Sequence, residues 1–133
     1  MIHEEICAYK VAKLSKDKGF NEYDSCHYVY EEDLQYPTCT PYTKASHINW
    51  SKPQFIAAPT QSLLQRWLRE EKGYAISVTA YPTLATMDKV CYAWEIKSSS
   101  DGQYMKAIDG EYTFSTYEQA LENALKYSLE NLV

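Results

Sequence analysis

The cysteine and histidine side chains are the residues here whose types most readily suggest chemistry. Cys26, His27, Cys39 and His47 are of the residue types that bind zinc and fall within one stretch of the chain. Structural zinc sites usually take two ligands from one turn, through spacings such as Cys-x2–4-Cys. The chain has no such pair, so we expect no metal site and interpret these residues as ordinary loop or core positions.

A cysteine acting as a nucleophile beside a histidine is the next possibility. A reactive thiolate needs an electropositive and partly exposed setting. No glycine-rich elbow and no cluster of basic residues accompanies Cys26, Cys39 or Cys91. Cys91 lies in an alternating stretch, where a free cysteine usually packs as a small apolar group. We therefore expect no covalent catalysis.

Carboxylates and glycines give no stronger indication of catalysis. The run Glu31-Glu32-Asp33 offers paired carboxylates, but acid–base catalysis needs environments that separate their pKa values. An exposed acidic run is more often simply solvated. The 4 glycines form neither a Gly-x-Gly-x-x-Gly nor a Walker-type pattern. The sequence predicts no catalytic residue and no cofactor.

The 13 tyrosines are the unusual feature of the composition. Tyrosine is enriched at protein interfaces. Tyr74, Tyr92 and Tyr117 fit strand or helix periods and are expected in the core. The tyrosines within residues 23–42 alternate with acids and follow no apolar period, which favours a surface that binds a basic partner. A loop packed on the sheet is the alternative. The candidate contacts are Tyr23, Tyr36, Tyr42, Glu31, Glu32 and Asp33.

The elements that position these residues differ between the two parts of the chain. A chain of 133 residues fits one domain, and we expect a single domain over residues 1–133. Residues 1–58 combine an N-terminal helix with a tyrosine-rich irregular region, and residues 59–133 form the more regular part. In the first part, the apolar stripe Cys7, Val11 and Leu14 predicts a helix over residues 4–18, closed by Gly19. Short strands are possible at 26–30 and 55–57, and residues 38–40 are expected to be a turn.

Residues 59–133 carry clearer periods. Leu64, Trp67 and Leu68 form one face of a helix over residues 60–72. Pro59 suits its first turn, with Thr60 or Ala58 near its cap. Alternation predicts strands at 74–81 and 90–97, and a third strand is plausible at 104–108. Ser115 and Glu118 resemble a capping box that opens a helix over residues 116–132.

This order, α-(irregular)-α-β-β-(β)-α, predicts an α+β fold. We expect a three- to four-stranded antiparallel sheet with helices on one face, because that arrangement buries all the apolar stripes together. The expected core residues are Trp67, Tyr92 or Trp94, Ile96, Leu121 and Leu125.

The charge distribution bears on partners and location. The net charge of −5 gives no positive face, and binding to phosphates depends on one, so nucleic acid is possible but disfavoured. Its only candidate contacts are Lys10, Lys13, Lys16, Lys18, Arg66 and Arg69. No secretory signal and no long apolar run is visible. We therefore expect no membrane partner, and free thiols in the cytoplasm.

Two resemblances add to this interpretation. The run from Ala58-Pro-Thr-Gln to Trp67-Leu-Arg-Glu-Glu71, with Gly73–Val78, resembles small uncharacterised phage, prophage and other mobile-element proteins of gut anaerobic bacteria. The segments Ala12–Phe20 and Thr116–Leu121 are similar to the same group. This resemblance implies a bacterial host cell as the setting and implies no catalytic residue.

Residues 59–132 also resemble a double-stranded-RNA-binding domain in element order. That family reads RNA through a lysine cluster at the start of its last helix, across phosphates and 2′-hydroxyls. The corresponding start here is Ser115-Thr-Tyr-Glu-Gln119, which is acidic. We expect a non-enzymatic protein-interaction module, an accessory protein of a phage or mobile element. A nucleic-acid-binding protein of this topology is the alternative.

Overall fold

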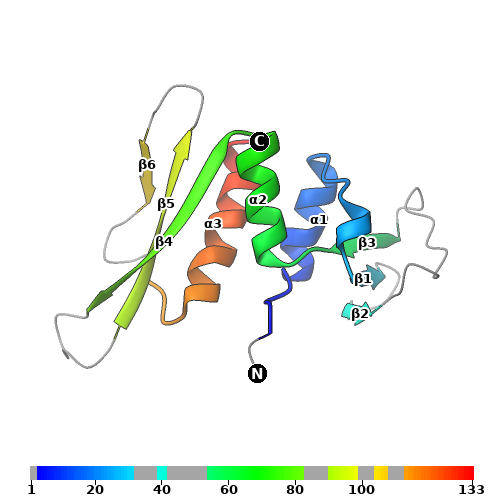
Figure 1. Cartoon of the computed structure of the whole chain (residues 1–133), viewed down its shortest axis with the longest axis horizontal. Coiled ribbons are helices and arrows are strands. Elements are labelled where there is room, and N and C mark those ends of the chain that lie inside the picture. Colours follow the sequence, from blue (N-terminus) through cyan, green and yellow to red (C-terminus); the bar gives the residue numbers. More distant parts are fainter. Residues whose placement is uncertain (1–2, 32–38, 42–53, 83–89, 99–103, 108–112) are drawn as a thin grey trace. The chain divides into compact units, whose positions relative to one another are not determined.

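The computed structural model describes residues 3–31, 39–41, 54–82, 90–98, 104–107 and 113–133 (Figure 1). By its internal contacts the chain divides into two compact units, residues 1–64 and 65–133. The boundary lies inside helix α2 (Gln61–Glu71), a few residues beyond the division expected after residue 58. That both parts form a single domain stays a prediction. The α+β class is confirmed, with helices and antiparallel sheets in both units.

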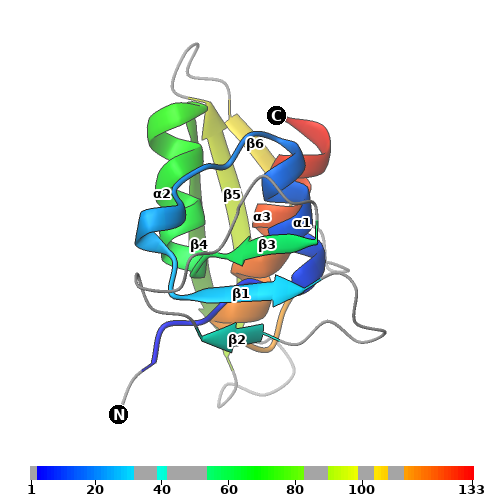
Figure 2. The same cartoon turned by 90° about the vertical axis from the view of Figure 1, so that its right-hand side faces the viewer.

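Unit 1 contains a three-stranded antiparallel sheet in the order β2-β1-β3 (Figure 2). Strand β1 (Tyr28–Glu31) lies in the centre, between β2 (Cys39–Pro41) and β3 (Phe55–Ala58). The strands expected near 26–30 and 55–57 are confirmed, whereas the turn expected at 38–40 was wrong for residues 39–40, which belong to β2. Pro41 is compatible with β2 because it ends an edge strand, where a missing N–H is tolerated.

Helix α1 (Tyr9–Asp17) is shorter than the helix expected over residues 4–18. The segment before it is extended instead, because it bonds to the start of α2. The N–H of Cys7 donates to the Pro59 carbonyl at 2.9 Å, and the N–H of Gln61 donates to the Glu5 carbonyl at 2.8 Å. The end of α1 is as expected, since Gly19 has a φ of +95°, which suits a glycine at a helix C-terminus.

The core of unit 1 lies between α1 and the sheet. Ala12, Tyr30, Ile56 and Ala58 form one buried cluster. The Tyr30 hydroxyl donates to the Cys7 carbonyl at 2.8 Å, so the polar end of this buried ring is satisfied. Its ring meets Tyr9 edge-on, with centroids 5.5 Å apart. Tyr30 therefore joins the sheet to α1 through its ring contact with Tyr9, and to the extended segment before α1 through its hydrogen bond to Cys7.

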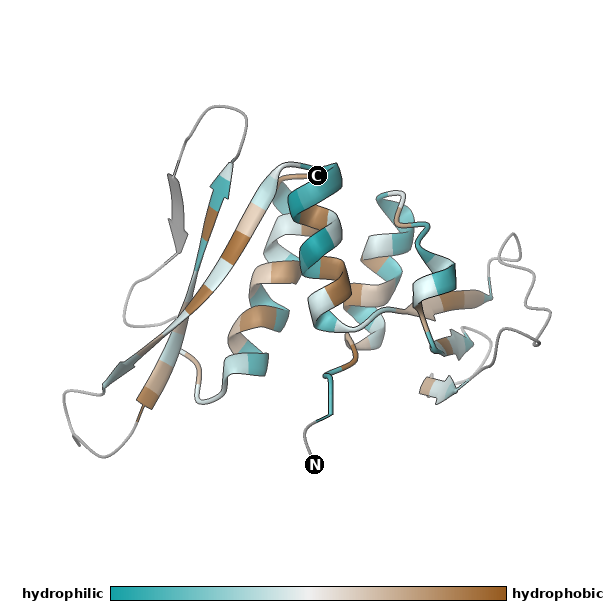
Figure 3. Ribbon diagram, in the orientation of Figure 1, coloured by the Kyte–Doolittle hydropathy of each residue, from teal (hydrophilic) through white to brown (hydrophobic). Residues whose placement is uncertain are grey.

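Unit 2 contains the expected three-stranded antiparallel sheet, in the order β4-β5-β6. Its strands are β4 (Tyr74–Pro82), β5 (Val90–Ser98) and β6 (Tyr104–Ala107). Ile76 pairs with Ile96 and Val78 with Trp94, so the apolar residues of the two long strands share one face. Figure 3 shows hydrophobic positions alternating with paler ones along both strands. The structure thus has two small sheets, one in each unit, where the sequence predicted one.

Helix α3 (Tyr117–Asn131) packs on β4 and β5. Its buried positions are Ala120, Leu121, Ala124, Leu125, Ser128 and Leu129. The helix starts one residue later than expected, because Thr116 and not Ser115 caps it: the Gln119 N–H donates to the Thr116 hydroxyl at 3.1 Å. The expected core residues Trp67, Trp94, Ile96, Leu121 and Leu125 are all buried, and Tyr92 is half-buried.

Helix α2 lies within the predicted range 60–72, and Pro59 precedes it instead of standing in its first turn. The Leu63 N–H donates to the Thr60 hydroxyl at 3.2 Å, as at a helix N-cap. Gly73, just past the other end, has a φ of +78° and leads directly into β4. Within unit 2, the Gln65 side-chain amide donates to the Ile76 carbonyl of β4 at 2.9 Å. None of the helices in the described ranges is long and apolar enough to cross a membrane.

Candidate functional site

The partner surface expected from the sequence lies in unit 1 and falls partly on described residues. Tyr23 begins the short helix η1 (Tyr23–Ser25) and is half-buried. Glu31 is exposed at the end of β1. The other four candidate contacts, Glu32, Asp33, Tyr36 and Tyr42, lie outside the described residues. That these six form one contact surface therefore stays a prediction.

Two further tyrosines of the same segment have opposite roles. Tyr30 belongs to the core of unit 1, which fits the alternative interpretation of a segment packed on a sheet. Tyr28, two residues earlier, keeps 37% of its surface exposed. Val29 between them is buried as well, so both faces of β1 are partly covered. Segment 23–42 thus combines structural and exposed tyrosines.

The four cysteines all carry free thiols. Cys7 and Cys26 are buried. Burial, together with the charge of Glu22, raises the pKa of the Cys26 thiol to about 12, and burial also raises the pKa of Cys39. These two thiols are protonated near neutral pH, whereas nucleophilic attack requires the thiolate. Among the described residues, no group of three or more His, Cys, Asp or Glu side chains is placed to hold a metal ion.

The raised pKa of Cys26 predicts a loss of stability in alkali. The unfolded thiol ionises near pH 9, its ordinary value, while the folded thiol stays protonated to about pH 12. The unfolded state then binds fewer protons than the folded state, so this contribution to stability is complete below pH 9 and is lost as pH rises above it. We expect the Tm of the wild type to fall more steeply than that of Cys26→Ala between pH 9 and pH 11. Parallel thermal melts of the two proteins test this, and equal slopes would contradict it.

A second aromatic group lies in unit 2, where β5 meets the start of α3. Phe114 pairs with Tyr92 of β5 through two backbone hydrogen bonds, of 2.8 and 2.9 Å. The chain then turns at Ser115, whose hydroxyl donates to the Gln119 side-chain oxygen at 2.8 Å. Thr116 caps the helix. The first turn of α3 is therefore fixed beside the strand.

Two tyrosines of α3 rest on aromatic residues of β5. The Trp94 ring nitrogen donates to the Asn123 side-chain oxygen at 3.0 Å, and its ring lies 5.1 Å from that of Tyr127. Tyr92 meets Tyr117 edge-on at 6.3 Å. Tyr117 and Tyr127 nevertheless keep 41% and 39% of their surfaces exposed. Tyr117 was expected in the core, but it lies on the first turn of α3, where Tyr92 covers only part of its ring.

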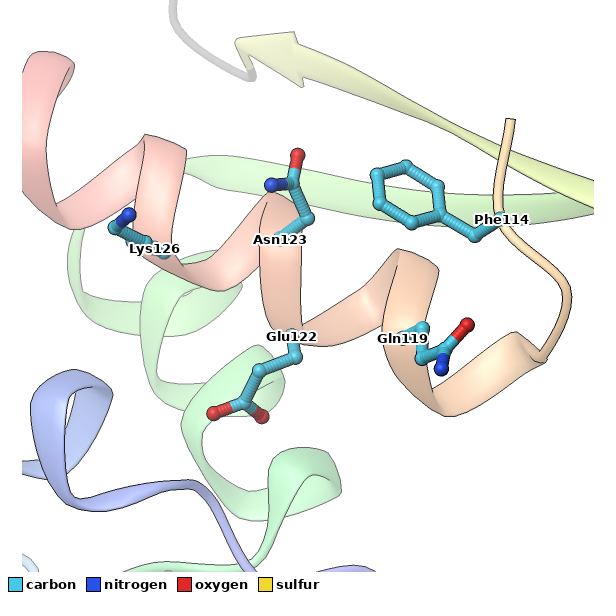
Figure 4. Close-up of a pocket in the computed structure, with 5 residues that line it drawn as sticks. All are labelled: Phe114, Gln119, Glu122, Asn123 and Lys126. Atoms are coloured by element: carbon cyan, nitrogen blue, oxygen red, sulfur yellow. The ribbon is translucent and has the colours of Figure 1, made fainter. Parts of the chain in front are cut away.

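A shallow depression of about 360 Å³ lies along α3. Its lining residues are Phe114, Gln119, Glu122, Asn123 and Lys126. Figure 4 shows Phe114 and Asn123 side by side next to β5, with Glu122 pointing away from Phe114. Because the Asn123 oxygen accepts from Trp94, its amide N–H groups are the donors that remain. We name Phe114, Tyr117, Asn123 and Tyr127, with the depression, the α3 aromatic surface.

The groups on this surface are of kinds that take part in recognition. An aromatic ring and side-chain amides can hold an apolar side chain and bond a neighbouring carbonyl. Its volume is at the lower end of small-molecule sites, about 300–1,000 Å³, which are also more enclosed. A shallow pocket of this kind suits an anchor side chain of a protein partner. The signal available in the sequence was Asn123, a polar residue at the edge of the apolar stripe of the last helix.

The basic residues considered for nucleic-acid contact are partly engaged within the protein. The Lys16 ammonium donates to the Phe55 carbonyl at 2.8 Å and so helps to hold β3 on α1. Arg66 pairs with Glu70 on the exposed side of α2, at 3.0 Å. Neither arrangement favours a phosphate-binding face.

Comparisons of the chain with models of protein families, with curated proteins and with solved structures find no match. The order α2-β4-β5-β6-α3 agrees with the expected α-β-β-β-α order. The resemblances to mobile-element proteins and to RNA-binding domains stay predictions.

Proposed function

We propose that this chain is a protein-interaction module and that the α3 aromatic surface contacts its partner. The observation that carries the proposal is the pair of exposed tyrosines of α3, Tyr117 and Tyr127, on the helix that also forms a depression with Phe114. Large amphipathic rings such as tyrosine are frequent anchors of protein–protein interfaces.

The surface is already ordered before binding. Tyr92 supports the Tyr117 ring, and Trp94 supports both Tyr127 and Asn123. Side chains held in this way lose little conformational entropy when a partner docks, which favours affinity. The hydrogen bond from the Ser115 hydroxyl to Gln119 similarly restricts one wall of the depression.

The charges along α3 indicate the chemistry of the partner. The helix carries Glu118, Glu122 and Glu130 against a single Lys126, and Lys126 lies 3.9 Å from Glu130. A partner with an apolar anchor residue flanked by basic residues would be steered toward this face. In our proposal the module is an accessory protein in the cytoplasm of a bacterial host. The run 58–71 and its resemblance to mobile-element proteins support that setting.

Loss of the two exposed tyrosines should weaken capture of the partner. We expect the double variant Tyr117→Ser/Tyr127→Ser to bind at least about tenfold more weakly, because anchor residues of this type each contribute about 1–2 kcal/mol or more. Quantitative pull-down from the native host identifies the partner. Titration of that purified partner against each variant then gives the change in Kd.

Two control variants separate the possible surfaces. Tyr28→Ser removes a tyrosine of similar exposure (37%) from unit 1 and should leave binding unchanged. The triple variant Tyr23→Ser/Tyr36→Ser/Tyr42→Ser tests the segment expected from the sequence. If the triple variant loses the partner and the Tyr117/Tyr127 variant keeps it, the contact surface is segment 23–42 and the present assignment is wrong.

A further inference from the structure

Strand β4 is an edge strand of the unit 2 sheet, and its second half, from Thr79 to Pro82, is exposed. It runs for 9 residues from Tyr74 to Pro82 and, among the strands of the described residues, is hydrogen-bonded to β5 alone. Edge strands are normally protected by charged residues, by an internal proline or by a bulge. Strand β4 has no charged residue, and its one proline is the last residue. Its register with β5 is continuous, without a bulge.

The hydrogen bonds of β5 show which groups of β4 face outward. Tyr92 uses both its N–H and its C=O for Phe114, on the side away from β4. Antiparallel strands direct successive residues to alternate neighbours, so Ala93 bonds its β4 partner Thr79. Thr79 therefore directs its backbone N–H and C=O toward β5, and the residues at alternate positions from it direct theirs outward, away from the sheet. They are Ile76, Val78, Ala80 and Pro82, and the bond from Gln65 to the Ile76 carbonyl agrees with this assignment.

We propose that β4 pairs antiparallel with β4 of a second copy of this chain, about a two-fold axis at Thr79. In this register Val78 lies opposite Ala80 of the second copy, and these residues exchange both N–H···O=C bonds. The N–H of Ile76 donates to the carbonyl of Pro82 in the second copy. Pro82 has no N–H to return, but the Ile76 carbonyl already accepts from Gln65. In this register, each outward N–H of Ile76, Val78 and Ala80 thus faces a backbone carbonyl of the second copy.

The Ile76 carbonyl and Pro82 also distinguish the register centred on Thr79 from those centred on Val78 and Ala80. An axis at Val78 would direct the N–H of Ala80 to the Ile76 carbonyl that Gln65 occupies. An axis at Ala80 would place Val78 opposite Pro82, which has no N–H to donate. Of these three registers, only the axis at Thr79 places Pro82, which has no N–H, opposite the Ile76 carbonyl, which already accepts a hydrogen bond from Gln65.

The side chains of β4 are also self-complementary in this register. Ile76, Val78, Ala80 and Pro82 lie on the face that bears Trp94 and would continue as one apolar stripe across both copies. Ser77, Thr79 and Tyr81 lie on the opposite face, where Thr79 would meet Thr79 of the second copy. Threonine pairs at such positions stabilise antiparallel sheets. Thr79, Ala80, Tyr81 and Pro82 are exposed in the single chain, so their surface is available for pairing.

Charge at the two-fold axis tests the proposal. Thr79→Lys and Thr79→Glu each place two like charges at Cβ separations of about 5 Å. Sedimentation velocity of the purified full chain should show a concentration-dependent dimer for the wild type. For each variant we expect the dissociation constant to rise by about fivefold or more. Thr113→Lys makes the same charge change at another exposed threonine of unit 2 and should leave the dimer intact.

Mixing the two variants distinguishes a lost interface from a damaged fold. An equimolar mixture of Thr79→Lys and Thr79→Glu places opposite charges at the axis and should restore the dimer. Ala80→Pro removes one outward N–H without touching the ladder to β5 and should also give a monomer. A wild type that is monomeric at every concentration overturns the proposal. A dimer that Thr79→Lys leaves unchanged, or a mixture that stays monomeric, overturns it too.

Discussion

Replacing Trp94 with alanine is expected to lower the free energy of unfolding by about 3–5 kcal/mol. Trp94 is buried in the middle of β5. It bonds Asn123 and packs on Tyr127, so its loss leaves a cavity between the sheet and α3. The Asn123 oxygen also loses its donor. Urea unfolding monitored by circular dichroism measures the change.

A matched control lies on the same strand and the same face. Val90 is 49% exposed, and Val90→Ala should change stability by no more than about 0.5 kcal/mol, as exposed substitutions usually do. Trp94→Phe keeps most of the apolar volume but removes the N–H that bonds Asn123. Its cost should fall between those of the other two variants. Equal costs for Trp94→Ala and Val90→Ala would show that Trp94 does not join α3 to the sheet.

Tyr30→Ala should destabilise unit 1 by a similar amount, about 3–5 kcal/mol. The ring fills the space between α1 and the sheet, and its hydroxyl satisfies the Cys7 carbonyl at 2.8 Å. Tyr30→Phe keeps the ring and leaves that carbonyl without its partner, a change that costs about 1–3 kcal/mol. The same urea titration measures both variants.

The neighbouring tyrosine provides the comparison. Tyr28 lies on the same strand but is 37% exposed, so Tyr28→Ala should cost clearly less than Tyr30→Ala. This pair also separates the two interpretations of the tyrosine-rich segment. If Tyr30→Ala were as mild as Tyr28→Ala, the segment would be more weakly packed than the buried ring indicates.

The regular part of the chain could be predicted because its signals are local. Alternation over 74–81 and 90–97 predicted strands that differ from β4 and β5 by one residue at one end. The stripe over 116–132 likewise predicted α3, which spans Tyr117–Asn131. In each case the period of the side chains alone determines the element and the face that it buries.

Unit 1 was harder to predict because distant residues decide its structure. The apolar spacing near Cys7 suggested a helix, yet bonds to Pro59 and Gln61 hold residues 5–7 extended. Strand β2 has only 3 residues and depends on pairing with β1. The α3 aromatic surface was missed for a related reason. A helical period predicts the direction of the Tyr117 and Tyr127 side chains. It does not predict how much of each ring the residues of β5 cover.

The pairing of residues 5–7 with residues 59–61 has a consequence for synthesis. A ribosome adds about 5–20 residues per second, so the first segment waits roughly 3–10 s for its partner to be made. During this time the Cys7 thiol, buried in the finished protein, is open to oxidants, and the apolar residues of α1 are open to chaperones. The β4–β5 hairpin, by contrast, joins neighbouring strands and can form within microseconds of leaving the exit tunnel. Unit 1 is therefore synthesised first but completes its fold only after residues 59–61 have been made. A translational pause before residue 59 would lengthen the time for which Cys7 and the apolar residues of α1 are exposed.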